Sequence, residues 1–147
     1  MQTQKNQFEL AELRFAYQAS TETVFTIEAD LIAERLNSIY TSTKSQCSQF
    51  YVLFASNFEI ICWYPLPDIN DQGSCNQQIV GLAIACNATS VILAQCCKSN
   101  RTKFNNFDRI MAINLFQACD KAGIDVIDYL LCHAGNYCSF KTDDFLN

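Results

Sequence analysis

Two adjacent cysteines and a later aspartate are the residues of this sequence that could most directly do chemistry. Cys96 and Cys97 follow an apolar run, and ten residues separate Cys97 from Asp108. These three side chains could bind a metal ion, or one cysteine could be a nucleophile if a nearby helix dipole lowers its pKa. Adjacent side chains at a strand end point to opposite faces, so one ion would not easily reach both thiols. We therefore favour the interpretation that the cysteines fill space as small apolar residues.

Two other groups of residues suggest a site less directly. His133, the only histidine, follows Cys132, but it lies beyond the strand predicted before it, so we interpret it as a surface or core-edge histidine. Three basic residues fall within six positions of a polar loop, at Lys98, Arg101 and Lys103. This loop could bind an anion or an acidic partner segment. Such a group of basic residues is more often simply exposed to solvent, and we favour that interpretation.

Composition limits the class of protein. Half of the 147 residues are hydrophobic and 17% are charged, so we expect one compact domain over residues 1–147. The formal net charge of -5 disfavours nucleic-acid binding. The first ten residues lack a signal-peptide pattern and no apolar run is long enough to span a membrane, so we expect a cytoplasmic protein with no membrane partner. An odd number of cysteines, nine, without an export signal argues against a disulfide scaffold.

Hydrophobic periodicity predicts the elements that must position these residues. The expected strands are 8–17, 50–55, 58–64, 89–94, 124–131 and 137–140, the second and third forming a hairpin. One helix is expected over 27–40 with Thr26 as its cap, and another opens at a Ser74/Gln77 capping box and ends near Asn87. A third begins near residue 106 and ends at Gly123. This order predicts an α/β fold with a mixed sheet between helices.

The segment after Asn87 resembles the RadC-like branch of the JAB/MPN (JAMM) metalloprotease family. In that family Asn-Ala-x-x-Val-Ile-Leu-Ala leads into His-x-His-Pro-Ser-Gly, and an Asp follows the second His after ten residues. Here Asn87-Ala-Thr-Ser-Val-Ile-Leu-Ala94 leads into Gln95-Cys96-Cys97-Lys98-Ser99-Asn100, with Asp108 in the same frame. The family's later elements are similar to Val126-Ile-Asp-Tyr-Leu-Leu131 and Tyr137-Cys-Ser-Phe140. The resemblance covers residues 8–146, is closest to short RadC-like proteins of Bacteroides-type bacteria, and implies a three-layer α-β-α, cytidine-deaminase-like fold.

The resemblance also implies a site, and this sequence departs from it at almost every position. The family's zinc is held by two His and one Asp, a Glu is the general base, and a Ser stabilises the oxyanion. The two His positions hold Gln95 and Cys97, while Asp108 keeps the carboxylate position. Ser48 or Gln49 stands at the Glu position, and Asn105 at the Ser position. Tyr129 stands where the family has a His after the aspartate. For Asp128 itself we expect a structural role.

These departures lead us to expect a catalytically inactive domain that acts as a binding or scaffolding module. An amide is a poor zinc ligand and one Cys with one Asp is too few, so we expect no metal or other cofactor. Loss of the general base would cost about another 10²–10⁴-fold in rate. We expect Gln95→His with Cys97→His to restore zinc binding without hydrolysis. The partner would be an unidentified protein, with a homodimer left open.

Two alternatives stay open. The first is a metal-dependent hydrolase, a JAMM-type peptidase or isopeptidase that uses zinc through altered ligands. The second is a DNA-repair-associated accessory protein, which rests only on the traditional label of RadC-like proteins. The acidic charge and the lack of the family's helix-hairpin-helix region in this sequence weigh against it.

Overall fold

The computed structural model describes residues 25–26, 28–44, 47–57, 59–66, 72–99, 101 and 103–142. The strand expected at 8–17 lies outside these residues. The elements in chain order are β1 (Phe25–Thr26), α2 (Ala29–Thr43), β2 (Gln49–Ser56), β3 (Glu59–Leu66), α3 (Gln72–Ala85), β4 (Ser90–Cys96), α4 (Asn106–Lys121), β5 (Asp125–His133) and β6 (Asn136–Ser139).

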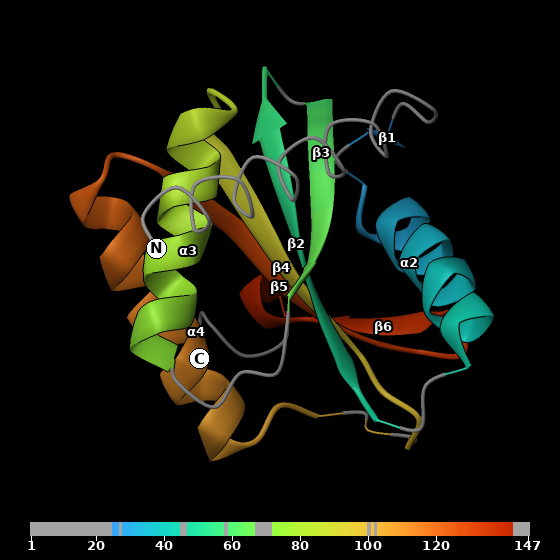
Figure 1. Ribbon diagram of the computed structural model, residues 1–147. Coiled ribbons are helices and arrows are strands. Elements are labelled where there is room, and N and C mark those ends of the chain that lie inside the picture. Colours follow the sequence, from blue (N-terminus) through green and yellow to red (C-terminus); the bar gives the residue numbers. More distant parts are fainter. Residues whose placement is uncertain are drawn as a thin grey trace, which may run out of the picture.

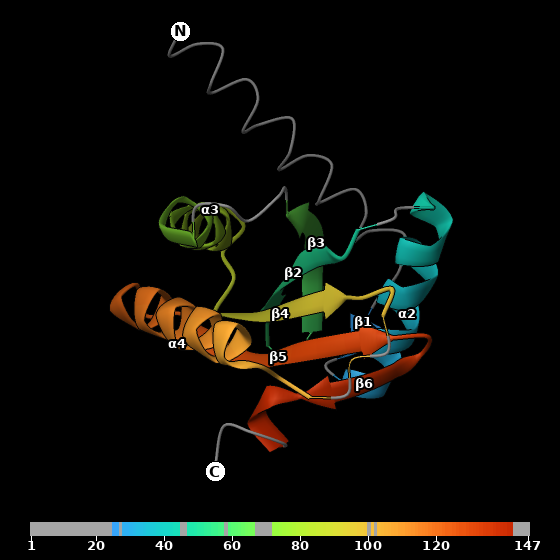
Figure 2. The same ribbon diagram turned by 90° about the horizontal axis from the view of Figure 1, so that it is seen from below.

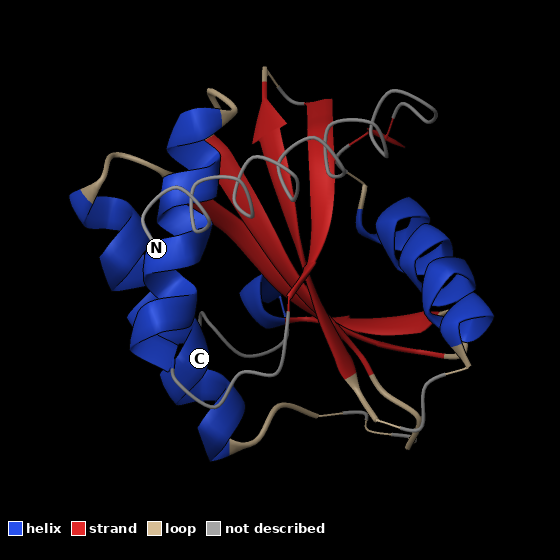
Figure 3. Cartoon of the chain, in the orientation of Figure 1, coloured by secondary structure: helices blue, strands red, loops and turns tan. Residues whose placement is uncertain are grey.

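The described strands form one mixed sheet in the order β1-β3-β2-β4-β5-β6. Only β4 and β5 run parallel, and α4 makes the crossover between them. Helix α2 covers one face of the sheet, whereas α3 and α4 lie side by side on the other (Figures 1, 2 and 3). The predicted α/β class and three-layer α-β-α arrangement are confirmed. No described helix combines the length and apolar character needed to cross a membrane.

The sheet separates two apolar cores, and the two-residue period of the strands assigns side chains to them. In β2, Val52 and Phe54 enter the core under α3 and α4, while Tyr51 and Leu53 enter the core under α2. Both sets are buried, which explains why this strand reads as a continuous apolar run instead of an alternating one.

The same alternation separates the two adjacent cysteines. Cys96 packs in the α2-side core, whereas Cys97 packs on the opposite side with Phe104 and Tyr129. The expectation that their side chains diverge is therefore confirmed. One ion cannot be held by both thiols without rebuilding the end of β4.

The predicted hairpin is present and longer than expected. Strands β2 and β3 pair antiparallel around Asn57, which has a left-handed φ of 53°, and a bulge leaves Ile61 without a register partner in β2. Pro65, expected in the following loop, belongs to β3 opposite Tyr51. Among the described residues β3 pairs with β1 only at Ile60 and Glu59, so at Pro65 one side of β3 has no described strand partner, which is the setting in which sheets tolerate proline.

The starts of two helices differ from the predictions. Helix α2 begins at Ala29 after Glu28, which makes no side-chain cap, and Thr26 belongs to β1 instead of capping the helix. Helix α3 begins at Gln72, so Ser74 lies within the helix backbone and not at its cap. Both helices therefore begin at positions that the local capping patterns do not predict.

The helix ends follow the expected turn chemistry. After α3, the Ala88 N–H donates to the Ala83 carbonyl (2.8 Å) and the Asn87 N–H to the Ile84 carbonyl (3.1 Å). Asn87 has φ 60°, so these bonds form a Schellman motif with asparagine in the left-handed position. Gly123, with φ 73°, plays the corresponding part after α4.

Candidate functional site

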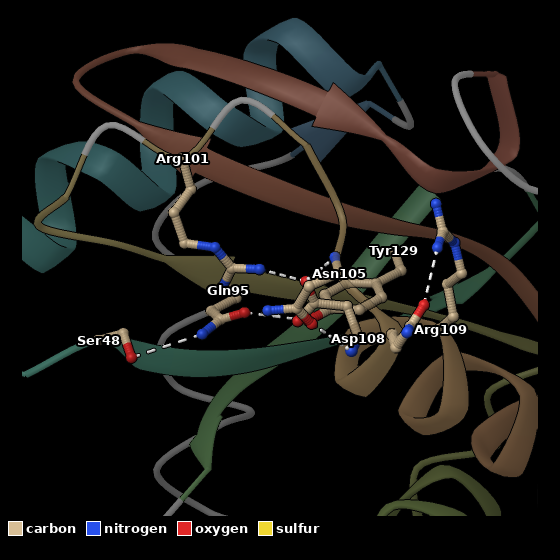
Figure 4. A network of polar contacts seen from close by, with 8 residues as sticks. Ser48, Gln95, Arg101, Asn105, Asp108, Arg109 and Tyr129 are labelled. Atoms are coloured by element: carbon tan, nitrogen blue, oxygen red, sulfur yellow. Dashed lines mark hydrogen bonds and ion pairs between the residues drawn. The ribbon is translucent and has the colours of Figure 1, made fainter.

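The end of β4 meets the first turn of α4 at the positions that the sequence pattern singled out. Asn105 caps α4: its Oδ1 accepts from the Asp108 N–H (2.8 Å), and Asp108 Oδ2 accepts from the Asn105 N–H (2.9 Å). This reciprocal capping box fixes the Asp108 carboxylate beside the end of β4 (Figure 4). Asp108 is only 1% exposed, so its negative charge needs compensation.

Arg101 supplies that compensation from the loop before α4. Its guanidinium forms an ion pair with Asp108 Oδ2, and Figure 4 shows the side chain pointing toward the carboxylate. Burial lowers the pKa of Arg101, but the charge of Asp108 and their hydrogen bond outweigh it and raise the pKa overall. Arg101 therefore differs from Lys98 and Lys103, which are exposed. Of the three basic residues in this loop, for which we favoured a solvated loop over an anion-binding one, two are exposed and the third, Arg101, is paired with Asp108.

Tyr129 completes the network from β5. Its hydroxyl lies 3.0 Å from Gln95 Oε1 and 3.3 Å from Asp108 Oδ1, so its single proton is shared between two acceptors. Gln95 turns its amide nitrogen to the Ser48 hydroxyl at 3.4 Å. Burial, followed by the negative charge of Asp108, raises the pKa of Tyr129 well above its usual value. The phenol therefore stays protonated and acts as a donor.

Cys97 and His133 meet through the backbone of Cys97 and not through its thiol. The Cys97 thiol is buried, and burial raises its pKa despite the nearby Arg101 guanidinium. His133 is the last residue of β5, not a residue beyond the strand as expected. Its Nδ1 lies 3.0 Å from the Cys97 carbonyl oxygen, a backbone contact and not a thiol contact. This arrangement provides no thiolate and imidazole pair for nucleophilic catalysis.

The two candidates for the general-base position are separated by the structure. Ser48 faces Gln95, whereas Gln49 donates to the Phe50 and Leu66 carbonyls at 2.8 and 2.6 Å and so joins β2 to β3. Neither side chain is a base that titrates near neutral pH. Ser48 and Gln49 can orient an amide and join two strands, but neither can itself remove a proton from water.

Asp128 lies outside this network and has the structural role expected for it. Its Oδ1 accepts from the Tyr129 N–H (2.8 Å) and the Lys141 N–H (3.0 Å), and its Oδ2 accepts from the Ser139 hydroxyl. These contacts tie β5 to the end of β6. The carboxylate thus holds the last described turn of the chain.

Comparison with known proteins decides the family. The model for the RadC-like JAB domain matches residues 30–145, which is most of the chain and runs from the first turn of α2 past the end of β6. The chain belongs to the RadC-like JAB domain family. The resemblance identified from the sequence is confirmed.

Curated relatives of this RadC-like JAB domain carry the name UPF0758. One from Actinobacillus pleuropneumoniae (serotype 5b, strain L20) is 31% identical over 77 residues, which cover 52% of this chain and 35% of the relative. One from Streptococcus suis (strain 98HAH33) is 24% identical over 110 residues, which cover 75% of this chain and 40% of the relative. The chain therefore spans well under half the length of these relatives.

The residues at the RadC-like metal position do not fit zinc. Gln95 offers a neutral amide, Cys97 a buried thiol with a raised pKa, and Asp108 a carboxylate already paired with a cation. Over the described part of the chain, no three His, Cys, Asp or Glu side chains group closely enough to hold a metal ion. A catalytic zinc needs three such ligands.

Sequence reasoning missed how Arg101 and Tyr129 would be used. The sequence places Arg101 only in a basic run of a polar loop, and the family pattern identifies Tyr129 only as standing at a histidine position. One signal was available: a tyrosine in a buried strand needs a partner for its hydroxyl. No comparable signal marked Arg101, because a loop side chain has no periodicity.

Proposed function

We propose that this RadC-like JAB domain is catalytically inactive and acts as a binding or scaffolding module. The saturated carboxylate of Asp108 is the observation that carries the proposal. Arg101, the Asn105 N–H and the Tyr129 hydroxyl already engage both of its oxygens. A metal ion could use this carboxylate only by displacing a buried ion pair.

Metal analysis of the unmodified protein tests this proposal. Protein purified without added metal should contain no stoichiometric zinc, and calorimetric titration with zinc should show no site at this position. About one equivalent of zinc that disappears in Cys97→Ala or Asp108→Ala would overturn the proposal. Zinc-dependent cleavage of isopeptide or small amide substrates would favour the alternative hydrolase.

Binding to duplex DNA tests the accessory repair role. The net charge of -5 should limit binding to ~10⁻⁴ M or weaker at physiological salt. Sub-micromolar binding that falls steeply with salt would favour the repair role over a protein-binding module.

The binding part of the proposal is supported by the outer face of α4. Phe107, Ile110 and Ile113 are 61, 57 and 47% exposed and recur every third residue, whereas the opposite face of the helix packs in the core. A row of large exposed apolar side chains is typical of a surface that contacts another protein. The occupant we propose is a second copy of this chain.

Charge complementarity supports that choice. The outer face of α4 has Arg109 near its start and Asp120 and Lys121 near its end. If a second α4 packs antiparallel about a two-fold axis near Asn114, Arg109 lies beside Asp120 of the second copy. Phe107 then lies beside Lys121 of the second copy, where the aliphatic stem and ammonium can cover the ring.

Sedimentation velocity at increasing protein concentration tests the dimer. We expect a concentration-dependent dimer that Ile110→Asp abolishes, while Ile84→Asp, at a 60% exposed position of α3, leaves it unchanged. Arg109→Asp should weaken association, and adding Asp120→Arg should restore it. A monomer at every concentration, or equal loss in both isoleucine variants, would contradict this occupant and leave a different protein partner as the one to seek.

A further inference from the structure

Two pairs of cysteine side chains lie close together outside the network around Asp108. Cys62 of β3 forms a side-chain hydrogen bond with Cys86 at the end of α3, and Cys132 of β5 forms one with Cys96 of β4. All four are free thiols. The pairs differ in access: Cys96 and Cys132 are both buried, whereas Cys86 is partly exposed next to a buried Cys62.

The local structure fixes Cys86 at the surface end of its pair. Cys86 precedes Asn87 in the Schellman motif, and its thiol donates to the Ala83 carbonyl at 3.6 Å. The hydrogen bond with Cys62 lowers the pKa of Cys86, and the N–H groups of Ala88 and Cys86 add to this effect against the opposing effect of burial. A partly exposed thiol that ionises readily is the kind that reacts with disulfides.

Cys62 occupies the inner position. It lies in the core under α3 and α4, beside the bulge at Ile61, with its thiol against that of Cys86. The hydrogen bond with Cys86 and burial both raise the pKa of Cys62. Small molecules therefore meet Cys86 first, and Cys62 is placed to react only with a group already on Cys86.

We propose that Cys86 is a site of thiol–disulfide exchange with low-molecular-weight disulfides of the glutathione class, and that Cys62 resolves the adduct. The Cys86 thiolate attacks one sulfur of the small disulfide, whose S–S bond breaks, and the released thiolate takes a proton from water. Cys62 then attacks the Cys86 sulfur, the bond from that sulfur to the small molecule breaks, and the proton of Cys62 passes to the departing thiolate to give the second small thiol. The two cysteines lose two electrons to form one disulfide, and the small disulfide gains two electrons to become two thiols.

The product would join the end of α3 to β3 and enclose residues 63–85 in a covalent loop. Cys96 and Cys132 are register partners on the neighbouring strands β4 and β5 and belong to the α2-side core. They serve as the control pair, because their thiols are also in contact but both are buried and closed to a small disulfide in solution. The difference between the two pairs makes the proposal testable in a single chain.

The experiment treats the folded full chain with glutathione disulfide, alkylates the remaining thiols under denaturing conditions and maps peptides by mass spectrometry. We expect a Cys62–Cys86 disulfide, with Cys96 and Cys132 recovered as alkylated thiols. In Cys62→Ala the reaction should stop at one glutathione on Cys86, and in Cys86→Ala residue Cys62 should stay reduced. Modification of the exposed Cys47 by glutathione shows that the reagent is active.

Three results would overturn the proposal. Oxidation of Cys96 and Cys132 at the same rate would mean that unfolding, not access, controls the chemistry. Modification of Cys47 with Cys86 unchanged would mean that Cys86 is not a reaction site. A stable adduct on Cys86 in the unmodified chain, without transfer to Cys62, would remove the resolving role. None of these results bears on metal binding near Asp108, so this inference and the proposed function fail separately.

Discussion

Asp108 and Asp128 each accept from three donors, but only Asp108 has a cation among them. Asp108 is bound by Arg101 together with a backbone N–H and a phenol, whereas Asp128 is bound by two backbone N–H groups and the Ser139 hydroxyl. Asp108 is 1% exposed and Asp128 is half-buried. A carboxylate with access to water is satisfied by dipoles, but one sealed in a core needs an opposite charge.

This difference bears on the proposal that the site binds no metal. The family resemblance implies a zinc ion beside the carboxylate at the position of Asp108. In this chain a guanidinium stands beside it, carried by the loop that follows β4. A carboxylate sealed in a core can thus be compensated by a cation that the protein itself supplies.

The largest expected effect is on zinc affinity. Gln95→His with Cys97→His rebuilds a three-ligand set, but zinc must still displace Arg101 from Asp108. Breaking a fully buried pair costs about 3–5 kcal/mol, and about 2–4 kcal/mol applies here because Arg101 is partly exposed. Adding Arg101→Ala should therefore tighten zinc binding by about 30- to 10³-fold. Calorimetric titration of the double and triple variants measures this difference, and adding Ser139→Ala in place of Arg101→Ala is the control.

Equal zinc affinity in the double and triple variants would show that Arg101 does not compete for the carboxylate. If the triple variant binds no zinc, Gln95 and Cys97 are not at the two histidine positions. Hydrolysis should stay absent in either variant, because neither Ser48 nor Gln49 can act as the missing base. The sequence alone led to the expectation that the double variant would suffice, and the Arg101 ion pair revises it.

The second effect is on stability. Arg101→Ala leaves the Asp108 carboxylate buried without its cation and should lower the free energy of unfolding by about 2–4 kcal/mol, below the range for a fully buried pair because Arg101 is partly exposed. Urea denaturation measures the change. Lys103→Ala, in the same loop but exposed, should stay within about 0.5 kcal/mol of the unmodified protein. Equal effects of the two substitutions would mean that the pair contributes nothing beyond an ordinary surface contact.

A smaller loss is expected from Tyr129→Phe. This change keeps the ring contacts with Phe104 and Phe140 but removes the hydroxyl shared by Gln95 and Asp108. Leaving buried acceptors without that donor should cost about 1–2 kcal/mol. Thermal and urea unfolding should show the loss, while Tyr137→Phe at an exposed position should be neutral. A neutral Tyr129→Phe would show that the hydroxyl does not stabilise the network.

The smallest effect should come from the Asp128 side of the comparison. Ser139→Ala removes one donor, but the N–H groups of Tyr129 and Lys141 stay in place and water can reach the carboxylate. We expect a loss of about 1 kcal/mol in urea unfolding, against no measurable loss for Ser42→Ala, whose exposed hydroxyl bonds only to the carbonyl of Ile39 among the contacts described. A loss as large as that of Arg101→Ala would remove the distinction between the two carboxylates.

The sequence by itself determined the helices and strands from α2 to β6, apart from some of their ends, together with their order and the frame of the family motif. The two-residue period of the strands was enough to separate Cys96 from Cys97, because successive side chains must point to opposite faces. The capping box of Asn105 and Asp108 lies within one helical turn and is therefore local in the sequence. The spacing from Asn87 to Asp108 matches the family pattern without a gap, so the residues at the family's ligand positions could be identified. Asp108 was identified as the retained carboxylate for the same reason.

Only the tertiary structure decided which side chains meet. Tyr129 contacts Gln95 and Asp108 across 34 and 21 positions of the chain, and such contacts depend on the parallel pairing of β4 with β5. The inward turn of Arg101 was not predictable because loop side chains follow no period, and Lys98 or Lys103 carried the same charge in the same run. A buried carboxylate requires a cation, but the path of the loop determines which one reaches it.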